Sequence, residues 1–324
     1  MNIKKIGLTA LAGSLVATSA IAGEMSVAGS ASMNVEHTNG GAANTGKTFS
    51  MGNQLTFTGS GELDNGLTVS LSFILDQGDD KGKTTSADDN AGAPFDSHSV
   101  TISSEGLGTL NFAGEGGGNV QSALDTTAAG DIWDSFDGTG DLTPGAAASG
   151  NNSFTYTLPS MVDGLTLKAS YLPTGSGTDS ATAWSASYAG VEGLTLSYGQ
   201  GDGNSPSTDV DASSLSATYA YGPITVGYSK TEYDSAAANS DKETTSYAIT
   251  YTVSDEISVK YGTEEIQSDA TAAVEDAEFA GVSVSYTAGG MTITAKMIDG
   301  ENLAYGTSAN EDVEYWKLGA SFAF

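Results

Sequence analysis

The sequence predicts an all-β chain that closes into a transmembrane antiparallel barrel of about sixteen strands. Three observations carry this prediction: an export signal at the N-terminus, strand-like alternation of apolar and small polar residues, and connections that are alternately short and long. Only 39% of the residues are hydrophobic, whereas glycine accounts for 42 of 324 and proline for 6. A barrel around a watery lumen fits this composition, because only its lipid-facing side chains need to be apolar.

The first 22 residues have the pattern of a secretory signal peptide. Two lysines precede a short apolar run over residues 6–21, which ends in the small-residue pattern Ala-Ile-Ala. This pattern predicts cleavage after Ala22 and leaves residues 23–324 as the barrel domain. A transmembrane helix is the alternative, but the apolar run is short for one, and no later stretch is long enough to span a bilayer as a helix.

The composition excludes several classes of function. The chain has 40 acidic residues and 11 basic ones, all of them lysine, for a formal net charge of −29. So acidic a surface argues against nucleic acid and against anionic ligands that need the paired hydrogen bonds of arginine. The chain has no cysteine, so its stability has to come from the closed ladder of strands.

Alternating residues indicate the strands. Residues 67–75 read Leu-Thr-Val-Ser-Leu-Ser-Phe-Ile-Leu, with apolar residues at the odd positions and small polar residues at most even ones. This is the period of a strand with one apolar face. Similar segments follow tight turns that end at or near Gly66, Gly164, Gly193, Gly222 and Gly290. The repetition predicts a series of hairpins.

The connections between the predicted strands alternate in length. Short turns are expected near residues 64–66, 105–108, 161–164, 190–193, 222, 254–255 and 288–290. Longer polar loops are expected at 37–46, 76–97, 114–150, 174–180, 201–211, 231–241, 263–275 and 299–311. Bacterial outer-membrane barrels have short turns on the periplasmic side and long loops on the extracellular side. A soluble β-sandwich has no reason to segregate its loops in this way.

The alternation also assigns side chains to the two faces of the barrel. In the strand from residue 165, Leu165, Leu167 and Tyr171 point outward, whereas Thr166 and Ser170 point inward. The same parity places four lysines in the lumen: Lys168, Lys260, Lys296 and Lys317. A lysine that faces lipid at mid-depth costs about 2–4 kcal/mol, so this placement supports the register.

The last predicted strand, residues 315–324, has Trp316, Leu318 and Phe322 on one face and ends in Phe324. Residues 106–114 form a Gly-rich hairpin before the longest loop, and a strand returns at 154–157. In these features the chain resembles the Gram-negative porins, and in particular the general porins of alphaproteobacteria of the Rhodobacter type.

The resemblance implies a channel in the outer membrane, in contact with lipid and lipopolysaccharide, that passes small hydrophilic solutes. It implies that Phe324 is the signal for the barrel-assembly machinery and that three copies form a homotrimer. It also implies that the third long loop folds into the lumen, where its acidic residues face a basic cluster on the barrel wall.

The third long loop, residues 114–150, carries the candidate constriction residues Glu115, Asp125, Asp131, Asp134, Asp137 and Asp141. Trp133 and Phe136 favour an inward fold, because apolar side chains are expected where a loop packs against a wall. The alternative is a solvated external loop. Inward positions on the strands near residues 50–58 and 68–74 carry no base, so this chain departs from the family pattern there. Unpaired carboxylates predict a weakly cation-selective pore.

Other polar clusters carry weaker signals. Asp79, Asp80, Asp88 and Asp89 form an acidic group that could hold Ca²⁺, but they lack the spacing of an EF-hand, and a solvated loop is the preferred interpretation. The only two histidines, His37 and His98, fall beside predicted loops. We expect no resident cofactor and no enzymatic activity, because neighbouring residues of a strand point to opposite faces and no oxyanion loop is visible.

Two alternatives to a general diffusion channel stay open at this point. One is a channel biased toward a class of solutes such as sugars, which a row of inward aromatic residues would indicate. The other, from a different class, is a secreted all-β adhesive or surface protein, which would be soluble without detergent.

Overall fold

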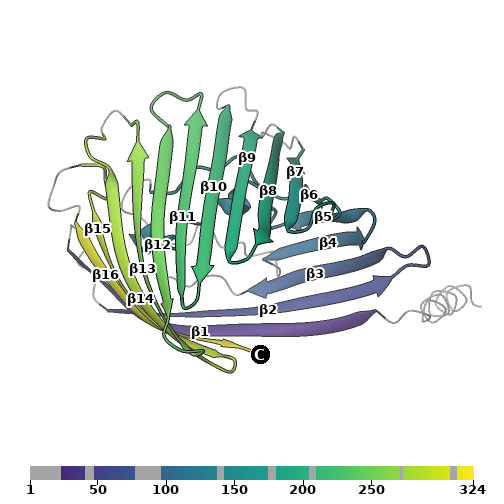
Figure 1. Cartoon of the computed structure of the whole chain (residues 1–324), viewed down its shortest axis with the longest axis horizontal. Coiled ribbons are helices and arrows are strands. Elements are labelled where there is room, and N and C mark those ends of the chain that lie inside the picture. Colours follow the sequence, from purple (N-terminus) through teal and green to yellow (C-terminus); the bar gives the residue numbers. More distant parts are fainter. Residues whose placement is uncertain are drawn as a thin grey trace, which may run out of the picture.

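The computed structural model describes residues 23–40, 47–76, 96–136, 142–173, 180–203, 209–270, 273–306 and 312–324. Within these ranges the chain forms a closed antiparallel barrel in which each strand pairs with its neighbours in sequence and β1 pairs with β16 (Figure 1). This confirms the predicted fold and strand number. The predicted signal peptide, residues 1–22, lies outside the described residues.

The strands are β1 (Glu24–Gly40), β2 (Thr48–Glu62), β3 (Thr68–Asp76), β4 (Ser97–Ser104), β5 (Gly108–Glu115), β6 (Ser153–Thr157), β7 (Leu165–Leu172), β8 (Ala181–Val191), β9 (Leu194–Gly203), β10 (Val210–Tyr221), β11 (Ile224–Ser235), β12 (Lys242–Thr252), β13 (Ile257–Ser268), β14 (Ala277–Ala288), β15 (Met291–Glu301) and β16 (Val313–Ala323). The described helices are two short 3₁₀ turns, η1 (Ser122–Leu124) and η2 (Ile132–Phe136). No helix in the described ranges is both long and apolar enough to cross a membrane.

The C-terminal residue takes part in the closure of the barrel. The backbone N–H of Gly29 on β1 donates to the carbonyl of Phe324 at 2.7 Å, and the N–H of Phe324 donates to the carbonyl of Gly29 at 2.9 Å. The Phe324 ring covers Gly29, so a side chain at position 29 would collide with it. The seam therefore depends on a glycine on one strand and on the last residue of the other.

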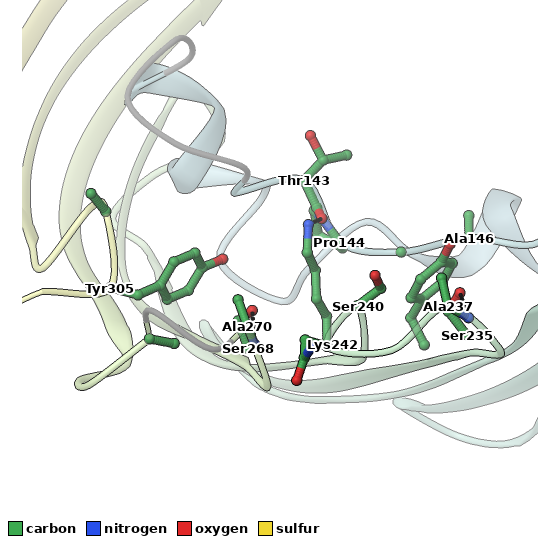
Figure 2. A pocket seen from close by; sticks show the side chains of 15 residues that line it. Thr143, Pro144, Ala146, Ser235, Ala237, Ser240, Lys242, Ser268, Ala270 and Tyr305 are labelled. Atoms are coloured by element: carbon green, nitrogen blue, oxygen red, sulfur yellow. Dashed lines mark hydrogen bonds between the residues drawn. The ribbon is translucent and has the colours of Figure 1, made fainter. Parts of the chain in front are cut away.

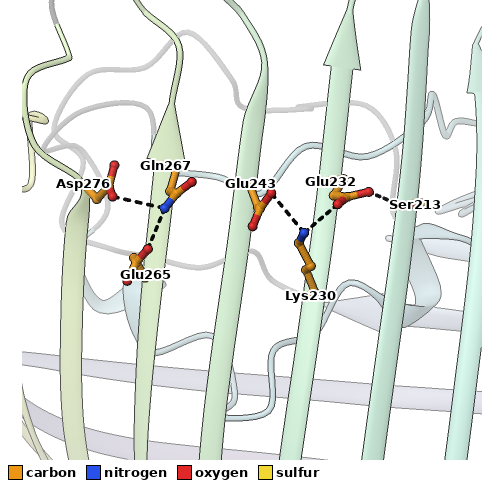
Figure 3. Close-up of polar contacts among 7 residues, drawn as sticks. All are labelled: Ser213, Lys230, Glu232, Glu243, Glu265, Gln267 and Asp276. Atoms are coloured by element: carbon orange, nitrogen blue, oxygen red, sulfur yellow. Dashed lines mark hydrogen bonds and ion pairs between the residues drawn. The ribbon is translucent and has the colours of Figure 1, made fainter.

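The predicted alternation of short and long connections is confirmed, but several long loops start later than expected, and the difference is largest after β11 and β13. Strand β11 continues to Ser235 rather than ending near residue 231, and β13 continues to Ser268 rather than ending near 263. Polar side chains pair beside the extension of β11, where Lys230 Nζ lies 2.6 Å from Glu232 on the same strand and 3.1 Å from Glu243 across the register on β12 (Figure 3). Polar composition predicted a loop here, but cross-strand pairs keep the backbone in the sheet.

The predicted faces are also confirmed. The inward Ser170, Ser214 and Ser246 are buried, whereas the outward Tyr171 and Tyr247 are about half exposed. The buried serines accept hydrogen bonds from a segment inside the barrel, which the next section describes. The outward residues have no protein neighbour on their outer side, as expected for side chains that face lipid.

The outer surface differs between the two halves of the barrel. On β9 to β16 the strand ends next to the long loops carry outward carboxylates that follow one another across the register: Asp202, Asp211, Asp234, Glu232, Glu243, Glu265, Glu278, Glu301, Asp299 and Glu314. The described outward positions of β1 to β4, β6 and β7 carry none. They hold apolar side chains, among them the stacked rings of Phe57 and Phe73, 4.9 Å apart.

Candidate functional site: the loop inside the barrel

The connection between β5 and β6 is here called loop 3, and its described residues, 116–136 and 142–152, lie inside the barrel. The first limb of loop 3, residues 116–136, makes hydrogen bonds to inward side chains of four strands. They join Val120 N to Ser170 Oγ on β7, Gln121 Nε2 to Ser214 Oγ on β10, Ala128 N to Ser229 Oγ on β11 and Ala129 N to Ser246 Oγ on β12. These distances are 2.8 to 3.1 Å. Since all four acceptors lie on the polar face of a closed barrel, loop 3 follows the inner wall.

Glutamine and asparagine side chains join the two limbs of loop 3. The Asn119 amide donates to the carbonyl of Ala147 at 2.6 Å, and Ala147 N donates to the Gln121 amide oxygen at 3.0 Å. Gln121 is fully buried, so it connects the outgoing limb, the returning limb and the β10 wall at once. The returning limb then passes Tyr233, whose ring packs directly on Gly145, where a larger residue would not fit.

One buried carboxylate holds the middle of loop 3. Glu264 on β13 is 3% exposed and accepts a hydrogen bond from the Thr127 hydroxyl. It also accepts from the backbone N–H groups of Ile132, at 3.1 Å, and Trp133, at 2.9 Å. A buried carboxylate is costly unless hydrogen bonds satisfy it, and here the first turn of η2 supplies them. The sequence pattern did not single out Glu264, because residues 263–275 were expected to form a polar loop, whereas β13 continues through Glu264 to Ser268.

Apolar packing fixes the far end of the first limb. Ile132 and Phe136 are buried against the barrel wall, where the Phe136 ring lies 5.5 Å from that of Phe279 and 6.2 Å from that of Tyr315. Trp133 packs against the same cluster and is partly buried. The sequence-based expectation that Trp133 and Phe136 anchor the loop agrees with this packing.

The predicted acids are only partly brought together. Asp125, Asp131 and Asp134 lie on the first limb of loop 3, and the Asp131 carboxylate accepts from Thr127 N at 2.9 Å. Glu115 instead ends β5, with its carboxylate 3.8 Å from the His98 ring. Asp137 and Asp141 lie outside the described residues.

Three of the four predicted lumen lysines lie in one row on the inner wall. The register places Lys260 opposite Ser283, Ser283 opposite Lys296 and Lys296 opposite Lys317, on β13 to β16. Loop 3 passes along this row, since Lys296 Nζ donates to Ser135 Oγ at 2.9 Å. Lys168 is apart from the row, on β7 between Thr157 and Ser185.

The lysines and the loop 3 acids therefore lie on the same side of the lumen. The inner faces of β2 and β3 carry uncharged polar residues at Gln54, Thr56, Thr58, Ser70 and Ser72, and carboxylates at the ends of the two strands, Glu62 and Asp76. The expected absence of bases on that wall agrees with the structure. The lysines partly offset the loop acids, which sequence analysis left undecided.

The carboxyl group of Asp125 has a raised pKa. Burial, and next the nearby negative charge of Asp131, raise the pKa of Asp125 to about 6. Both effects disfavour the ionised carboxylate. Asp125 therefore changes charge in the range between mildly acidic and neutral pH, whereas an ordinary aspartate is already ionised there.

A cavity of about 660 Å³ opens between the returning limb of loop 3 and the extracellular ends of β11 to β13 (Figure 2). Thr143, Tyr233, Lys242 and Tyr305 are among its lining residues, and the Lys242 ammonium donates to the carbonyl of Thr143 at 3.2 Å. Tyr233 and Tyr305 lie in segments that the sequence pattern predicted as polar loops, and that pattern gave no signal for this cavity.

No metal site is visible in the part of the chain that the structure describes, where no three His, Cys, Asp or Glu side chains are grouped to hold an ion. The sequence-based calcium candidates Asp79, Asp80, Asp88 and Asp89 lie outside the described residues.

A closed barrel of sixteen antiparallel strands with one long loop folded against its inner wall defines a transmembrane channel protein. The family model for Gram-negative porins matches residues 7–324. The chain therefore belongs to the Gram-negative porin family and is a channel protein of the outer membrane. A comparison with curated proteins found no match.

Solved structures share the fold at low sequence identity. A loop L8 deletion mutant of OmpT, an outer-membrane protein of Vibrio cholerae, is 17% identical with a TM-score of 0.72, covering 94% of this chain and 100% of that one. An anion-selective porin from Comamonas acidovorans is 16% identical with a TM-score of 0.65, covering 93% and 100%. A mutant of the Rh. blastica porin is also 16% identical, with a TM-score of 0.66 and the same coverage.

Proposed function

We propose that this protein is a passive diffusion channel for small hydrophilic solutes, with a weak preference for cations. The observation that carries the proposal is the position of loop 3, which narrows the lumen while it leaves the inner faces of β2 and β3 uncovered. Solutes pass between the charged loop and this polar wall, whose carboxylates lie at the strand ends, Glu62 and Asp76. The alternation of hydroxyl and amide groups on the wall offers hydrogen bonds without a specific binding pattern.

The charge balance supports a weak rather than a strong preference. Asp125, Asp131 and Asp134 give the loop a negative potential, and two charges about 4 Å apart interact by about 1 kcal/mol in water. Lys260 and Lys296 lie along the same loop and reduce this potential. The formal net charge of −29 for the whole chain gives both entrances of the channel a negative potential, which raises the local concentration of cations.

Liposome swelling tests the diffusion function directly. Liposomes that contain the refolded protein should swell in neutral sugars, at rates that fall smoothly as the sugar becomes larger. Swelling that equals that of protein-free liposomes would reject the channel. A control variant, Glu264→Gln, tests whether the size dependence follows from the position of loop 3, since this substitution removes an acceptor for loop backbone N–H groups.

We further propose a homotrimer that associates through the outer face of β1 to β6. Described outward positions of β1 to β4 and β6 lack carboxylates, and Phe49 and Met51 are 83% and 63% exposed in the single chain. The opposite half carries outward acids that would repel one another in a contact between like faces. Analytical ultracentrifugation in detergent should give three chains per particle, and Met51→Glu should give single chains.

We also propose how the chain is exported and assembled. Residues 1–22 are the secretory signal, cleaved after Ala22, and residues 23–324 form the mature barrel. The barrel-assembly machinery recognises Phe324 at the end of the closing strand, and the finished apolar belt contacts outer-membrane lipid and lipopolysaccharide. Within the family, the hairpin at 106–114 and the long segment after it support a relationship to the Rhodobacter-type general porins. The function contains no catalytic step.

A channel biased toward sugars is the second candidate. The cavity that Tyr233 and Tyr305 line favours it, because aromatic rings beside hydroxyl groups are suited to sugar surfaces. A saturable decrease of ion current on addition of sucrose, lost in Tyr305→Ala, would support this bias. If the current falls only in proportion to the viscosity of the sugar solution, the sugar bias is rejected and the general diffusion channel is supported.

A further inference from the structure

One end of β1 has a strand neighbour on one side only. Strand β1 pairs with β2 from Glu24 onward, whereas its pairing with β16 starts at Ser30, next to the two backbone hydrogen bonds between Gly29 and Phe324. Figure 1 shows β1 continuing past the point where β16 ends. In the part of the chain that the structure describes, no strand pairs with residues 24–28 on that side. These five residues are here called the free edge.

The free edge is a regular strand segment, because β2 holds it on its other side. The register with β2 continues through it, and Ser26 Oγ lies 2.5 Å from Thr58 Oγ1 across that pairing. All residues of the free edge are nevertheless exposed, and Gly29 is the first residue of β1 that is less exposed. The missing cover is therefore on the side where β16 has ended.

Two residues of the free edge direct their backbone groups to the open side. Consecutive residues of a strand bond alternately to its two neighbours, and Gly29 bonds to Phe324 through both its N–H and its C=O. By this alternation, Val27 and Met25 point their N–H and C=O groups away from β2. Proteins usually protect such an edge with lysine, proline or a bulge. The free edge has none of these.

Acidic groups surround the free edge. Glu24 belongs to it, Glu62 ends the adjacent strand β2, and Asp64 lies in the turn that follows. Glu24 and Glu62 share the inner face, because Glu24 lies opposite Ser60, two residues before Glu62. Lysine and arginine are absent from residues 23–46, 48–80 and 318–324. Since like charges on neighbouring strands destabilise a sheet, the charge here favours a basic strand as the partner.

We propose that the free edge binds an extended, basic segment of a periplasmic protein, which adds a strand beside β1 where β16 has ended. The backbone of the added strand bonds to Met25 and Val27. Its apolar side chains cover the outward side chains of these two residues, which are 82% and 59% exposed. Its basic side chains occupy the alternate positions and lie on the same face as Glu24 and Glu62.

The location of the free edge supports a partner from the periplasm. Outer-membrane barrels turn their short connections toward the periplasm, and the free edge lies next to the short turn between β2 and β3. Unpaired backbone groups are not tolerated in hydrocarbon, so the open side lies where water or a partner strand can reach it. The proposal goes beyond the diffusion function, because docking here attaches the channel to another protein without entering the lumen.

Hydrogen exchange followed by mass spectrometry tests the docking on the folded protein in detergent. The probe is a short synthetic peptide of alternating lysine and valine. Its addition should slow exchange in residues 23–29 and leave loop 3 unchanged. Slower exchange in loop 3 alone would show that the peptide enters the acidic lumen, and would overturn the proposal. Slow exchange of residues 23–29 before peptide is added, increasing with protein concentration, would assign the edge to a second copy of the chain and would also overturn it.

Two substitutions at one position separate backbone pairing from side-chain contact. Val27→Pro removes the N–H that faces the open side, whereas the bonds to β2 come from the neighbouring residues. The affinity for a labelled peptide, measured by fluorescence anisotropy, should fall roughly two- to tenfold, as expected for one lost hydrogen bond. Val27→Thr keeps the N–H and the branched shape and should bind as the wild type does. Equal affinities of the two variants, both with the gel mobility of a folded barrel, would contradict the strand pairing.

Charge variants keep the proposal testable if Val27→Pro does not fold. The double variant Glu24→Gln, Glu62→Gln should weaken peptide binding at low salt, where charges are least screened. The matched control replaces acids of two other short turns, Asp163→Asn and Glu192→Gln, and should leave the affinity unchanged. The proposal is rejected if the control weakens binding as much as the first double variant, or if the wild-type protein does not bind the peptide.

Discussion

Glu264 of β13 accepts a hydrogen bond of 2.9 Å from the backbone N–H of Trp133 in loop 3, across 131 positions of sequence. With Ile132 N and the Thr127 hydroxyl, this contact fixes the loop at its centre. The cost of a buried carboxylate is thereby offset by three donors that the loop would otherwise leave unsatisfied. We therefore expect the width of the lumen to depend on this contact.

Glu264→Gln should loosen loop 3, because an amide cannot accept hydrogen bonds at its nitrogen. A buried donor left without a partner costs about 1–3 kcal/mol, which is enough to populate a detached loop. We expect noisier single-channel currents and faster proteolysis within loop 3. Glu265→Gln, at the next position but on the outer face, should change neither measurement. Equal noise in both variants would mean that Glu264 does not hold the loop.

The assignment of faces predicts unequal effects for two neighbouring substitutions on β13. Val259 is outward, opposite Val284, and Ser258 is inward, opposite Ser285. Val259→Arg should lower the free energy of unfolding by about 2–4 kcal/mol if it lies near the bilayer midplane, whereas Ser258→Arg places its charge in water. Reversible urea unfolding in lipid vesicles measures both. Similar losses for the two variants would contradict the register.

The raised pKa of Asp125 predicts that the ion selectivity of the channel depends on pH. Its pKa is raised to about 6 by burial and by Asp131, so it is mostly ionised at neutral pH and mostly neutral at about pH 5. The preference for cations should therefore fall as the pH decreases through about 6. Zero-current potentials measured against pH should lack this step in Asp125→Asn and keep it in Asp134→Asn. A step that persists in Asp125→Asn would assign it to another group.

Deletion of Phe324 should impair assembly. The deletion removes both backbone hydrogen bonds to Gly29 and the ring that covers it, at the seam between β1 and β16. We expect less folded protein in the outer membrane, measured as the fraction that keeps its fast gel mobility without heating. Phe324→Tyr, which keeps the backbone contacts and the ring, should assemble normally. Normal levels of the truncated chain would argue against a role for this residue.

The sequence predicted the fold well, because each strand carries its own evidence. Alternation from Leu165 to Tyr171 is a local property, and so is the turn that precedes it. The extensions of β11 and β13 were missed because their residues, Glu232 and Glu265 among them, have the polar composition of a loop until the partner strand is known.

The candidate site was less predictable, because it depends on contacts between distant parts of the chain. Parity placed Lys260, Lys296 and Lys317 in the lumen, but only the register shows that they form a row beside loop 3. Glu264 and Glu265 lie in a segment that was predicted as a loop, and only the register shows that they lie on opposite faces of β13.

The zero-current potential across a KCl gradient tests the central claim, that the charges of loop 3 inside the lumen govern the passage of ions. The wild-type channel should prefer cations, and the triple variant Asp125→Asn, Asp131→Asn, Asp134→Asn should prefer them less. Its conductance at high salt should stay nearly unchanged, because screening shortens to about 3 Å at 1 M. The outward triple variant Glu232→Gln, Glu243→Gln, Glu301→Gln should shift the potential less. An anion-selective wild-type channel, or equal shifts from the two triple variants, would contradict the claim.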